Sequence, residues 1–467
     1  MTDVIKGKVR LINSEADARD LYTVAPAHYH GKVGLEVEMP LFKPGAFRPQ
    51  IPQAHEMLKM HAELKAKGYD AQLEASGVLE YASPPVDVKD TAKLVMQAKK
   101  DLAAFEAAAA QHGYARAPFC ILPTTSLADA LQNKVPRERL EASLAVIRDA
   151  FNEDITHIPL LTTGVQTSFS PKNNDEMFRM AVRGYAVTPL LIAAMNSSAG
   201  FSCNDNAPKD GHLRGKYYDF YGTSGGISPA FKNSSNAEEL ITNHIAQVFD
   251  APMFFAYDTE GNMLRSTKGN ILTFRKLAEE GLNTQTNYEL AESFLYNDIK
   301  ICNLRDEAGA VVGKRIEVRA ADSGLHQPAS TLLLTAAVVP DGKTADAFDA
   351  LLKDYGFTGN PRDDGALLET ARRGAIEHNG RFMDVPFGTG TLRDFAADVA
   401  GLVEAHYSAD KTVAPEVSKL CDVLLTGECD AKAFARKYPT LQAVANDLQK
   451  TAVPKPAAVK AGRKFTA

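Results

Sequence analysis

The chain has 467 residues, of which 45% are hydrophobic and 24% are charged, as in a folded globular protein and unlike a disordered one. Its formal net charge of -6 argues against nucleic acid or an anionic membrane as the main partner and favours small charged substrates. Scattered cysteines without a CxxC pair, no apolar stretch of the ~20 residues that span a bilayer, and no secretory core in residues 1–10 predict a cytoplasmic protein.

Strands and long helices alternate in the first two thirds of the chain. Short segments bounded by Gly, Pro or Ser, often alternating in polarity, predict strands. They cover residues 33–39, 77–83, 118–122, 163–170, 252–257 and 315–320. Apolar residues at helical spacing predict helices over residues 90–112 and 174–195, and we expect Pro189 to kink or break the second helix.

After Pro340 the pattern predicts one helix after another. These helices cover residues 344–354, 366–377, 392–406, 413–425, 431–437 and 441–450. The whole predicts an α+β fold, with a mainly antiparallel sheet, helices on its apolar face and a helical C-terminal lobe. We expect a catalytic sheet domain over 1–340, the helical lobe packed on it over 341–450, and a mobile basic tail over 451–467.

Three predicted strands carry pairs of polar side chains two residues apart. The pairs are Glu36 with Glu38, Gln166 with Ser168, and Glu317 with Arg319. Residues i and i+2 of a strand lie on one face, about 6.6 Å apart, so the members of each pair point the same way. A further strand adds Glu80 among apolar neighbours. One such strand is typical of a solvated sheet face, but four together indicate a polar site.

Carboxylates gathered on one face repel each other, and their pKa values rise unless a cation lies among them. Divalent cations bind oxygen ligands, and Mg²⁺ in particular accompanies nucleotide phosphates. We therefore expect the glutamates of these strands to be magnesium ligands: Glu36, Glu38, Glu80 and Glu317. Arg319 has two possible roles, a bidentate phosphate contact or a salt bridge to the same carboxylates. Complete nucleotide-binding motifs are absent, and the Gly-rich residues 222–226 are more typical of a turn than of a lid.

The order of these segments resembles the glutamate-cysteine ligase superfamily, in the branch shared by plants and many bacteria. Residues 34–38 (GLEVE) resemble its opening acidic strand, and residues 315–322 (RIEVRAAD) resemble its YxEMRGAD segment. Further similar segments are residues 78–85, 163–169, 196–201, 251–257 and 425–428. The resemblance extends over most of the chain, from about residue 30 to about residue 450.

The resemblance implies a glutamine-synthetase-like, curved antiparallel sheet that forms a funnel. It implies an enzyme that uses ATP and Mg²⁺ to activate the γ-carboxylate of glutamate as an acyl phosphate. An amine then attacks, most simply cysteine, which gives γ-glutamylcysteine for glutathione biosynthesis. By position, the four glutamates match metal ligands of the family. Arg319 and Gln166 match its catalytic residues, and Arg214, Ser168 and Arg319 match residues that contact the substrate or ATP.

Some segments depart from the family pattern. Ser168 replaces an asparagine, and residues 323–327 (SGLHQ) replace a GGPWR-like continuation. Residues 137–141 keep little of a KxRYxxM signature. The amine acceptor therefore stays open, as does glutamate itself. The alternatives are a related ligase with another amine, a non-catalytic nucleotide- or metabolite-binding relative, and a phosphotransferase. The oligomeric state does not follow from the sequence.

Overall fold

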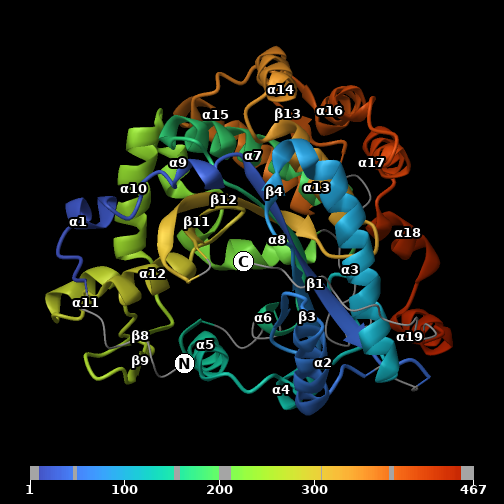
Figure 1. Ribbon diagram of the computed structural model, residues 1–467, viewed down its shortest axis with the longest axis horizontal. Coiled ribbons are helices and arrows are strands. Elements are labelled where there is room, and N and C mark those ends of the chain that lie inside the picture. Colours follow the sequence, from blue (N-terminus) through green and yellow to red (C-terminus); the bar gives the residue numbers. More distant parts are fainter. Residues whose placement is uncertain are drawn as a thin grey trace.

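The computed structural model describes residues 10–45, 50–151, 158–198, 212–306, 308–377 and 383–453. At its centre an eight-stranded sheet, in the order β11-β12-β6-β1-β3-β2, curls around the middle of the molecule (Figure 1). Its main strands are β1 (Lys32–Phe42), β2 (Ala71–Leu73), β3 (Val78–Ala82), β6 (Gly164–Phe169), β11 (Ile299–Arg305) and β12 (Val311–Asp322). Short strands β4 (Val86–Asp87) and β5 (Ala115–Arg116) also pair with β1, and every pairing is antiparallel.

Alternation of side chains gives this sheet two unlike faces. Along β1, buried Leu35, Val37 and Met39 alternate with the half-buried Glu36 and Glu38. Successive strand side chains point to opposite faces, so the apolar set packs into the core while the carboxylates line the other face. We call the second face the polar face. It carries Glu36, Glu38, Glu80, Gln166, Ser168, Arg315, Glu317 and Arg319.

Three long helices cover the apolar face. Helix α13 (Gln327–Val338) packs on β1, β6 and β12, α7 (Asn174–Ala194) on β12, and α3 (Thr91–Gln111) on β3. Almost every residue of α13 is buried, as expected of a helix inside a core, and its Thr335 hydroxyl bonds Thr167 at 3.0 Å. Pro189 does not end α7, which continues to Ala194.

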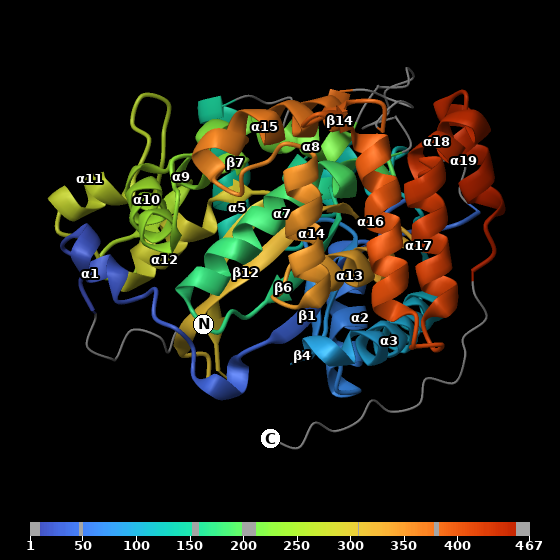
Figure 2. The same cartoon turned by 90° about the horizontal axis from the view of Figure 1, so that it is seen from above.

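The predicted C-terminal helices are confirmed. They are α14 (Lys343–Asp354), α15 (Pro361–Glu377), α16 (Leu392–Tyr407), α17 (Ala414–Thr426), α18 (Asp430–Lys437) and α19 (Leu441–Lys450). Helices α16 to α19 stand along one side of the molecule (Figure 2). Helix α15 packs on α7, and α16 and α17 pack on α13, so Phe348, Leu368 and Phe395 share one core with the sheet. The domain boundary at residue 340 stays a prediction, and tail residues 454–467 lie outside the described part.

The other elements surround the sheet. The helices are α1 (Glu15–Arg19), α2 (Ala54–Ala66), α4 (Leu127–Gln132), α5 (Glu138–Val146), α6 (Ile158–Leu161), α8 (Leu213–Phe220), α9 (Pro229–Lys232), α10 (Ala237–Asp250), α11 (Phe274–Glu279) and α12 (Gln285–Ser293). The small strands are β7 (Gly225–Gly226), β8 (Phe255–Tyr257), β9 (Met263–Arg265), β10 (Tyr296–Asn297), β13 (Pro386–Phe387) and β14 (Gly390–Thr391). No helix within the described ranges is long and apolar enough to cross a membrane.

The predicted fold class is confirmed, with errors among the strands. Residues 118–122 form no strand, although Phe119, Cys120 and Ile121 are all buried. Phe119 instead packs against Phe434 of α18, with ring centroids 4.7 Å apart. Strands β2 and β11 were not predicted, although they form the two edges of the sheet.

Candidate active site

The strand register brings the predicted site residues together on the polar face. Directly opposite one another lie Glu38 and Glu80, Glu36 and Gln166, and Ser168 and Glu317. Opposite residues of antiparallel strands have Cβ atoms about 4.5–5.5 Å apart, so side chains from distant parts of the sequence become neighbours. The polar face therefore gathers all four predicted metal ligands and the predicted catalytic residues Gln166 and Arg319.

Glu317 is held between two arginines of its own strand. Arg315 Nη2 lies 2.9 Å from one carboxylate oxygen, and Arg319 Nη1 donates to the other. Burial alone would raise the pKa of Glu317, but Arg315 and Arg319 lower it to about 2. The carboxylate is thus an anion at neutral pH, and each arginine keeps further N–H groups for other partners.

Arg315 was not among the predicted site residues. Its Nη1 donates to Ser168 Oγ at 2.6 Å and lies 3.3 Å from Glu36 Oε1. It precedes Glu317 by two residues, so strand alternation places it on the same face. The alternating sequence Arg-Ile-Glu-Val-Arg is the signal that could have identified it. Arg315 and Arg319 are the two cations of this part of the face.

Gln166 links the cationic and acidic parts of the polar face. Its Oε1 accepts from Arg319 Nη1 at 2.8 Å, and its Nε2 donates to Glu38 Oε1 at 3.1 Å. The N–H of Gly164 donates to the other oxygen of Glu38 at 2.6 Å. An amide suits this position because it offers a donor on one side and an acceptor on the other.

The acidic part of the face has too little positive charge. Burial, followed by repulsion from Glu74, raises the pKa of Glu38 to about 7 and that of Glu80 to about 10. Burial and Glu317 also raise the pKa of Glu36. Glu74 follows β2 and was not among the predicted ligands, since it is not on a strand with other charged residues. Such a set of buried carboxylates provides the oxygen donors that a divalent cation prefers.

The donors fit Mg²⁺ by their chemistry. In the described part of the chain, no three His, Cys, Asp or Glu side chains converge closely enough to hold a metal ion in this conformation. Glu36 and Glu317 are paired with Arg315 instead. The roles of Glu36, Glu38, Glu80 and Glu317 as metal ligands therefore stay predictions.

Arg214 lies at one end of the site, on α8. The side chain is buried, and its Nη1 donates to the backbone carbonyls of Arg319 and Ala321, the latter at 3.1 Å. A Cβ atom at Gly164 would come within 2.5 Å of this guanidinium. Arg214 thus supports the main chains of β12 and β6, and its predicted contact with a substrate stays a prediction.

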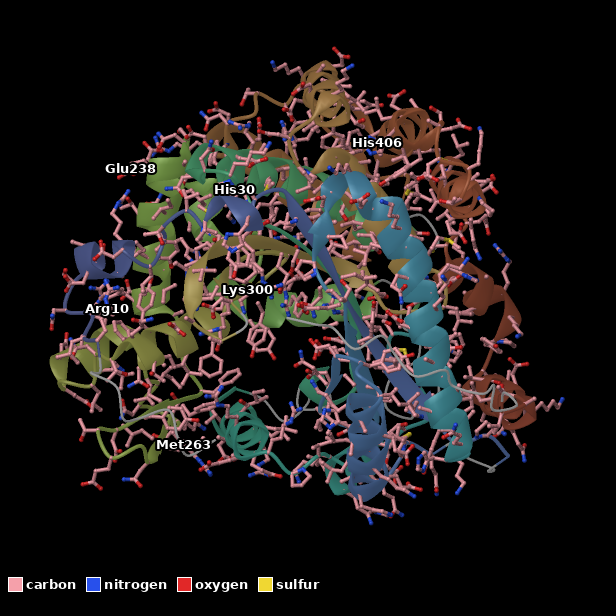
Figure 3. All side chains as sticks on the ribbon, viewed as in Figure 1. Arg10, His30, Glu238, Met263, Lys300 and His406 are labelled. Carbon is pink, nitrogen blue, oxygen red and sulfur yellow. The ribbon has the colours of Figure 1, made fainter. Side chains whose placement is uncertain are left out.

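Lys300 adds a third cation to this face. It lies opposite Glu317 on β11, near the middle of the molecule (Figure 3). Its Nζ donates to the Ser293 carbonyl at 2.8 Å, and burial lowers its pKa. Because β11 was not predicted as a strand, sequence reasoning missed this residue.

A cavity of about 330 Å³ opens beside Glu36 and Arg315. Polar side chains line one part of it, and apolar residues line another. The polar part includes Lys32, Ser83, Ser168, Ser170 and Asn303, and the apolar part includes Leu35, Phe169 and Leu304. Ligand sites are commonly clefts of about 300–1,000 Å³ with this mixture of lining, so the cavity has room for a nucleotide-sized group.

Ser168 and the 323–327 segment both contact strands of the polar face, since Ser323 Oγ donates to the backbone carbonyl of Glu38. Ser168 contacts Arg315 on the polar face, whereas the charges nearest His326 are those of Lys419, Asp430 and Arg116. The loop at residues 196–201 is described only to residue 198, and Cys203 lies outside the described ranges.

The chain is similar to known proteins in sequence and in fold. The glutamate-cysteine ligase family 2 matches residues 32–384, a range that includes every predicted site residue. Among solved structures, 26 chains match. One is the glutamate-cysteine ligase of Francisella tularensis in complex with AMP, with a TM-score of 0.52, 13% identity, and coverage of 93% of this chain and 91% of that chain. No curated protein matches at a significant level. At this identity, the structural similarity concerns the fold.

Proposed function

The chain belongs to the glutamate-cysteine ligase family 2, and we propose that it is an ATP- and Mg²⁺-dependent ligase that joins the γ-carboxylate of glutamate to an amine, most simply that of cysteine. The observation that carries this proposal is the position of Glu317 between Arg315 and Arg319, beside a group of buried carboxylates. Phosphoryl transfer to a carboxylate needs cations around an anionic centre, and this face supplies them.

We place the nucleotide in the cavity beside Glu36 and Arg315, with its phosphates toward the arginines of β12. The related ligase from Francisella was solved with AMP, which supports nucleotide binding on this fold. Lys32 adds positive charge at the cavity wall, while Tyr29, Pro85 and Leu304 offer apolar surface to a base. Arginine binds phosphate oxygens in a bidentate manner, so Arg315 and Arg319 suit the phosphate end.

Glu36, Glu38, Glu80 and Glu317 would hold the magnesium ions. When bound, Mg²⁺ neutralises charge on the phosphoryl group that is transferred. Its positive charge would also relieve the repulsion that raises the pKa values of Glu38 and Glu80. These carboxylates repel each other when no cation is bound. We therefore expect the activity to depend on magnesium.

The reaction has two steps. An oxygen of the substrate γ-carboxylate attacks the γ-phosphorus of ATP, and ADP leaves. The amine nitrogen then attacks the acyl carbon, loses a proton, and phosphate leaves with one oxygen of the original carboxylate. Arg315 and Arg319 stabilise the charge on the transferred group, and Gln166 holds Arg319 in place through its 2.8 Å hydrogen bond. The buried position of the site protects the acyl phosphate from water.

A different amine acceptor is the second candidate. Ser168 replaces the asparagine of the related ligases, and its hydroxyl bonds Arg315 at 2.6 Å. A change at this position alters the polar face beside the phosphate groups without removing any charge. If cysteine is the acceptor, the product is γ-glutamylcysteine, the precursor of glutathione.

The test is ADP release by the purified protein with ATP and Mg²⁺, first with glutamate alone and then with cysteine and a panel of other amines. Release that needs glutamate and cysteine, with γ-glutamylcysteine in the mass spectrum, supports the simplest form. Release with another amine only would identify the second candidate. Glu317→Gln should be inactive, and the matched variant Glu238→Gln, on α10 at the surface, should keep full activity (Figure 3). No release with any pair of substrates would contradict the proposal.

A further inference from the structure

We propose that Arg372 of α15 is a positioning residue for Arg319, and this role rests on the function proposed above. Arg372 lies in the C-terminal helical region and belongs to none of the strands that form the polar face. Its side chain is 1% exposed, and its two arms reach two acidic residues on different elements, Asp298 and Asp219. Asp298 itself and helix α8, which carries Asp219, both contribute a hydrogen bond to the backbone of Arg319.

The backbone of Arg319 depends on groups outside the β6 ladder. Between Val318 and Ala321 the register of β12 with β6 shifts, so β6 does not pair regularly with this stretch. The N–H of Arg319 donates instead to the carbonyl of Asp298 at 2.9 Å, and its carbonyl accepts from Arg214. An irregular strand position beside an active site needs such additional contacts to aim its side chain.

Arg372 connects these two contacts. Its Nε donates to the carboxylate of Asp298, which is itself 1% exposed. Its Nη1 donates to Asp219, on the helix α8 that also carries Arg214. The partner of the Arg319 N–H and the helix that supports the Arg319 carbonyl are therefore both anchored to one guanidinium. The planar fork of arginine allows this, whereas lysine presents a single point charge.

The surroundings hold this connection firmly. The N–H of Asp298 donates to the carbonyl of Gly226 at 2.9 Å, and Gly226 has φ +57°. A Cβ atom there would lie 3.0 Å from Cζ of Arg372. Gly226 thus leaves room for Arg372, and together with Gly225 it forms β7, which pairs with β10.

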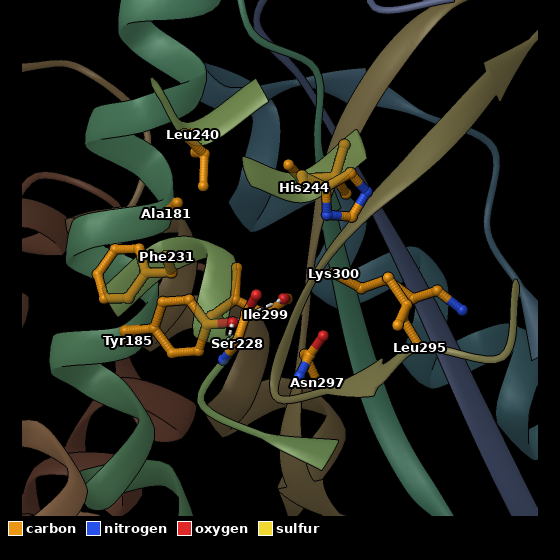
Figure 4. Close-up of a pocket in the computed structure, with 11 residues that line it drawn as sticks. Ala181, Tyr185, Ser228, Phe231, Leu240, His244, Leu295, Asn297, Ile299 and Lys300 are labelled. Atoms are coloured by element: carbon orange, nitrogen blue, oxygen red, sulfur yellow. Dashed lines mark hydrogen bonds between the residues drawn. The ribbon is translucent and has the colours of Figure 1, made fainter. Parts of the chain in front are cut away.

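The segment around Asp298 is fixed on its other side by α7. The hydroxyl of Tyr185 donates to the Ile299 carbonyl at 3.1 Å and accepts from the Ser228 N–H at 3.1 Å (Figure 4). The cavity between these side chains and Asn297 measures about 20 Å³, room for about one water molecule. If Asp298 moves, the groups around it have little room to adjust. We therefore expect Arg319 to move with it.

The experiment compares Arg372→Lys with Arg183→Lys. Arg183 is a matched control, since it is 2% exposed and also bridges two acidic residues, Asp341 and Asp349, which lie by α14 away from the polar face. Two quantities are measured on the full chain: kcat and KM for ATP in the ligase assay, and hydrogen exchange of the backbone amides in residues 315–322. The second does not require activity.

Arg372→Lys should lower kcat by about 10- to 100-fold and accelerate exchange at Arg319, as loss of a supporting contact does elsewhere. Arg183→Lys should leave both within about twofold of the parent protein. Unchanged kcat and unchanged exchange in Arg372→Lys would overturn the proposal, and so would equal effects of the two variants. If Arg372→Lys does not fold, Asp219→Asn, at a more exposed position, should show the same two effects, and its failure to do so counts equally against the proposal. A parent protein without ligase activity would contradict the proposed function, while the exchange measurement would still decide whether Arg372 positions Arg319.

Discussion

Glu38 and Glu80 lie directly opposite each other on β1 and β3, two carboxylates on the same face of one antiparallel ladder. Like charges at this position repel, and burial, with Glu74 close by, adds to the effect. An ordinary sheet avoids such a pair. Its presence beside Glu317 and the two arginines of β12 is best explained by a function that brings cations and phosphate to this face.

The first prediction concerns the pH dependence of stability without metal. The pKa of Glu80 is about 10 in the folded protein and near 4.5 in an unfolded chain. The folded state therefore keeps a proton that the unfolded state loses, and the free energy of unfolding falls as pH rises between these values. Glu80→Gln should remove this part of the slope. Urea denaturation at pH 5, 7 and 9 in the presence of a chelator measures it, and identical slopes in both proteins would count against the raised pKa.

The second prediction concerns Arg315, which the sequence analysis overlooked. Arg315→Ala removes the contacts with Ser168, Glu36 and Glu317 and leaves the pKa of Glu317 to be lowered by Arg319 and Lys300. We expect kcat/KM for ATP to fall by about 100-fold or more, the usual size for a group that stabilises charge in a transition state. Arg275→Ala is the control, because Arg275 pairs with Asp250 at the surface. Steady-state kinetics decide the matter, and equal kcat/KM values in the two variants would contradict the assignment.

The third prediction tests the close approach of Gly164 and Arg214. Gly164→Ala would place a Cβ atom 2.5 Å from the guanidinium of Arg214, which is held by two carbonyls of β12 and cannot easily move. We expect a loss of about 1–3 kcal/mol in stability, together with reduced activity. Gly401→Ala, on the open side of α16, meets no atom within 4 Å and should be neutral or slightly stabilising. Thermal denaturation of both variants compares them directly, and a neutral Gly164→Ala would show that the strand can shift.

The fourth prediction concerns a buried ion pair outside the site. Glu292 of α12 is bonded by Lys314 at 2.7 Å and lies 3.2 Å from His244. Burial alone would raise the pKa of Glu292, but Lys314 and His244 hold it well below its ordinary value. This stabilisation is complete above the unfolded-state pKa near 4.5 and disappears as pH falls toward the lower folded-state pKa.

Glu292→Gln should therefore lose about 3–5 kcal/mol at pH 7, because Lys314 keeps a buried charge without its partner. The difference from the parent protein should shrink at pH 3 to 4. Denaturation at the two pH values measures this, with the exposed Glu238→Gln as a neutral control. A difference that stays constant across this pH range would show that Glu292 acts through packing alone.

Local patterns predicted much of this molecule. The i, i+2 alternation of strand residues identified Glu36, Glu38, Gln166 and Glu317, and helical spacing identified the C-terminal helices, although α15 begins at Pro361 rather than at residue 366. Arg315 follows the same alternation and was overlooked. Glu74 and Lys300 lacked any such pattern, since Glu74 follows a strand and β11 carries mixed side chains at the sheet edge. Strand order decides which strands are neighbours, and register decides which residues lie opposite each other. Both depend on long-range pairing that no short segment encodes. The role we assign to Arg372 depends entirely on tertiary contacts.

Oxygen transfer from the substrate carboxylate to phosphate tests the central claim most directly. Glutamate labelled with ¹⁸O in its γ-carboxylate is incubated with the protein, ATP, Mg²⁺ and the amine that gives the highest ADP release. If the reaction passes through a γ-glutamyl phosphate, each phosphate released carries one labelled oxygen, because the amine displaces the phosphoryl group together with that oxygen. Mass spectrometry of the phosphate measures the label. Labelled phosphate is the result we predict, and ADP formation with unlabelled phosphate would contradict the account.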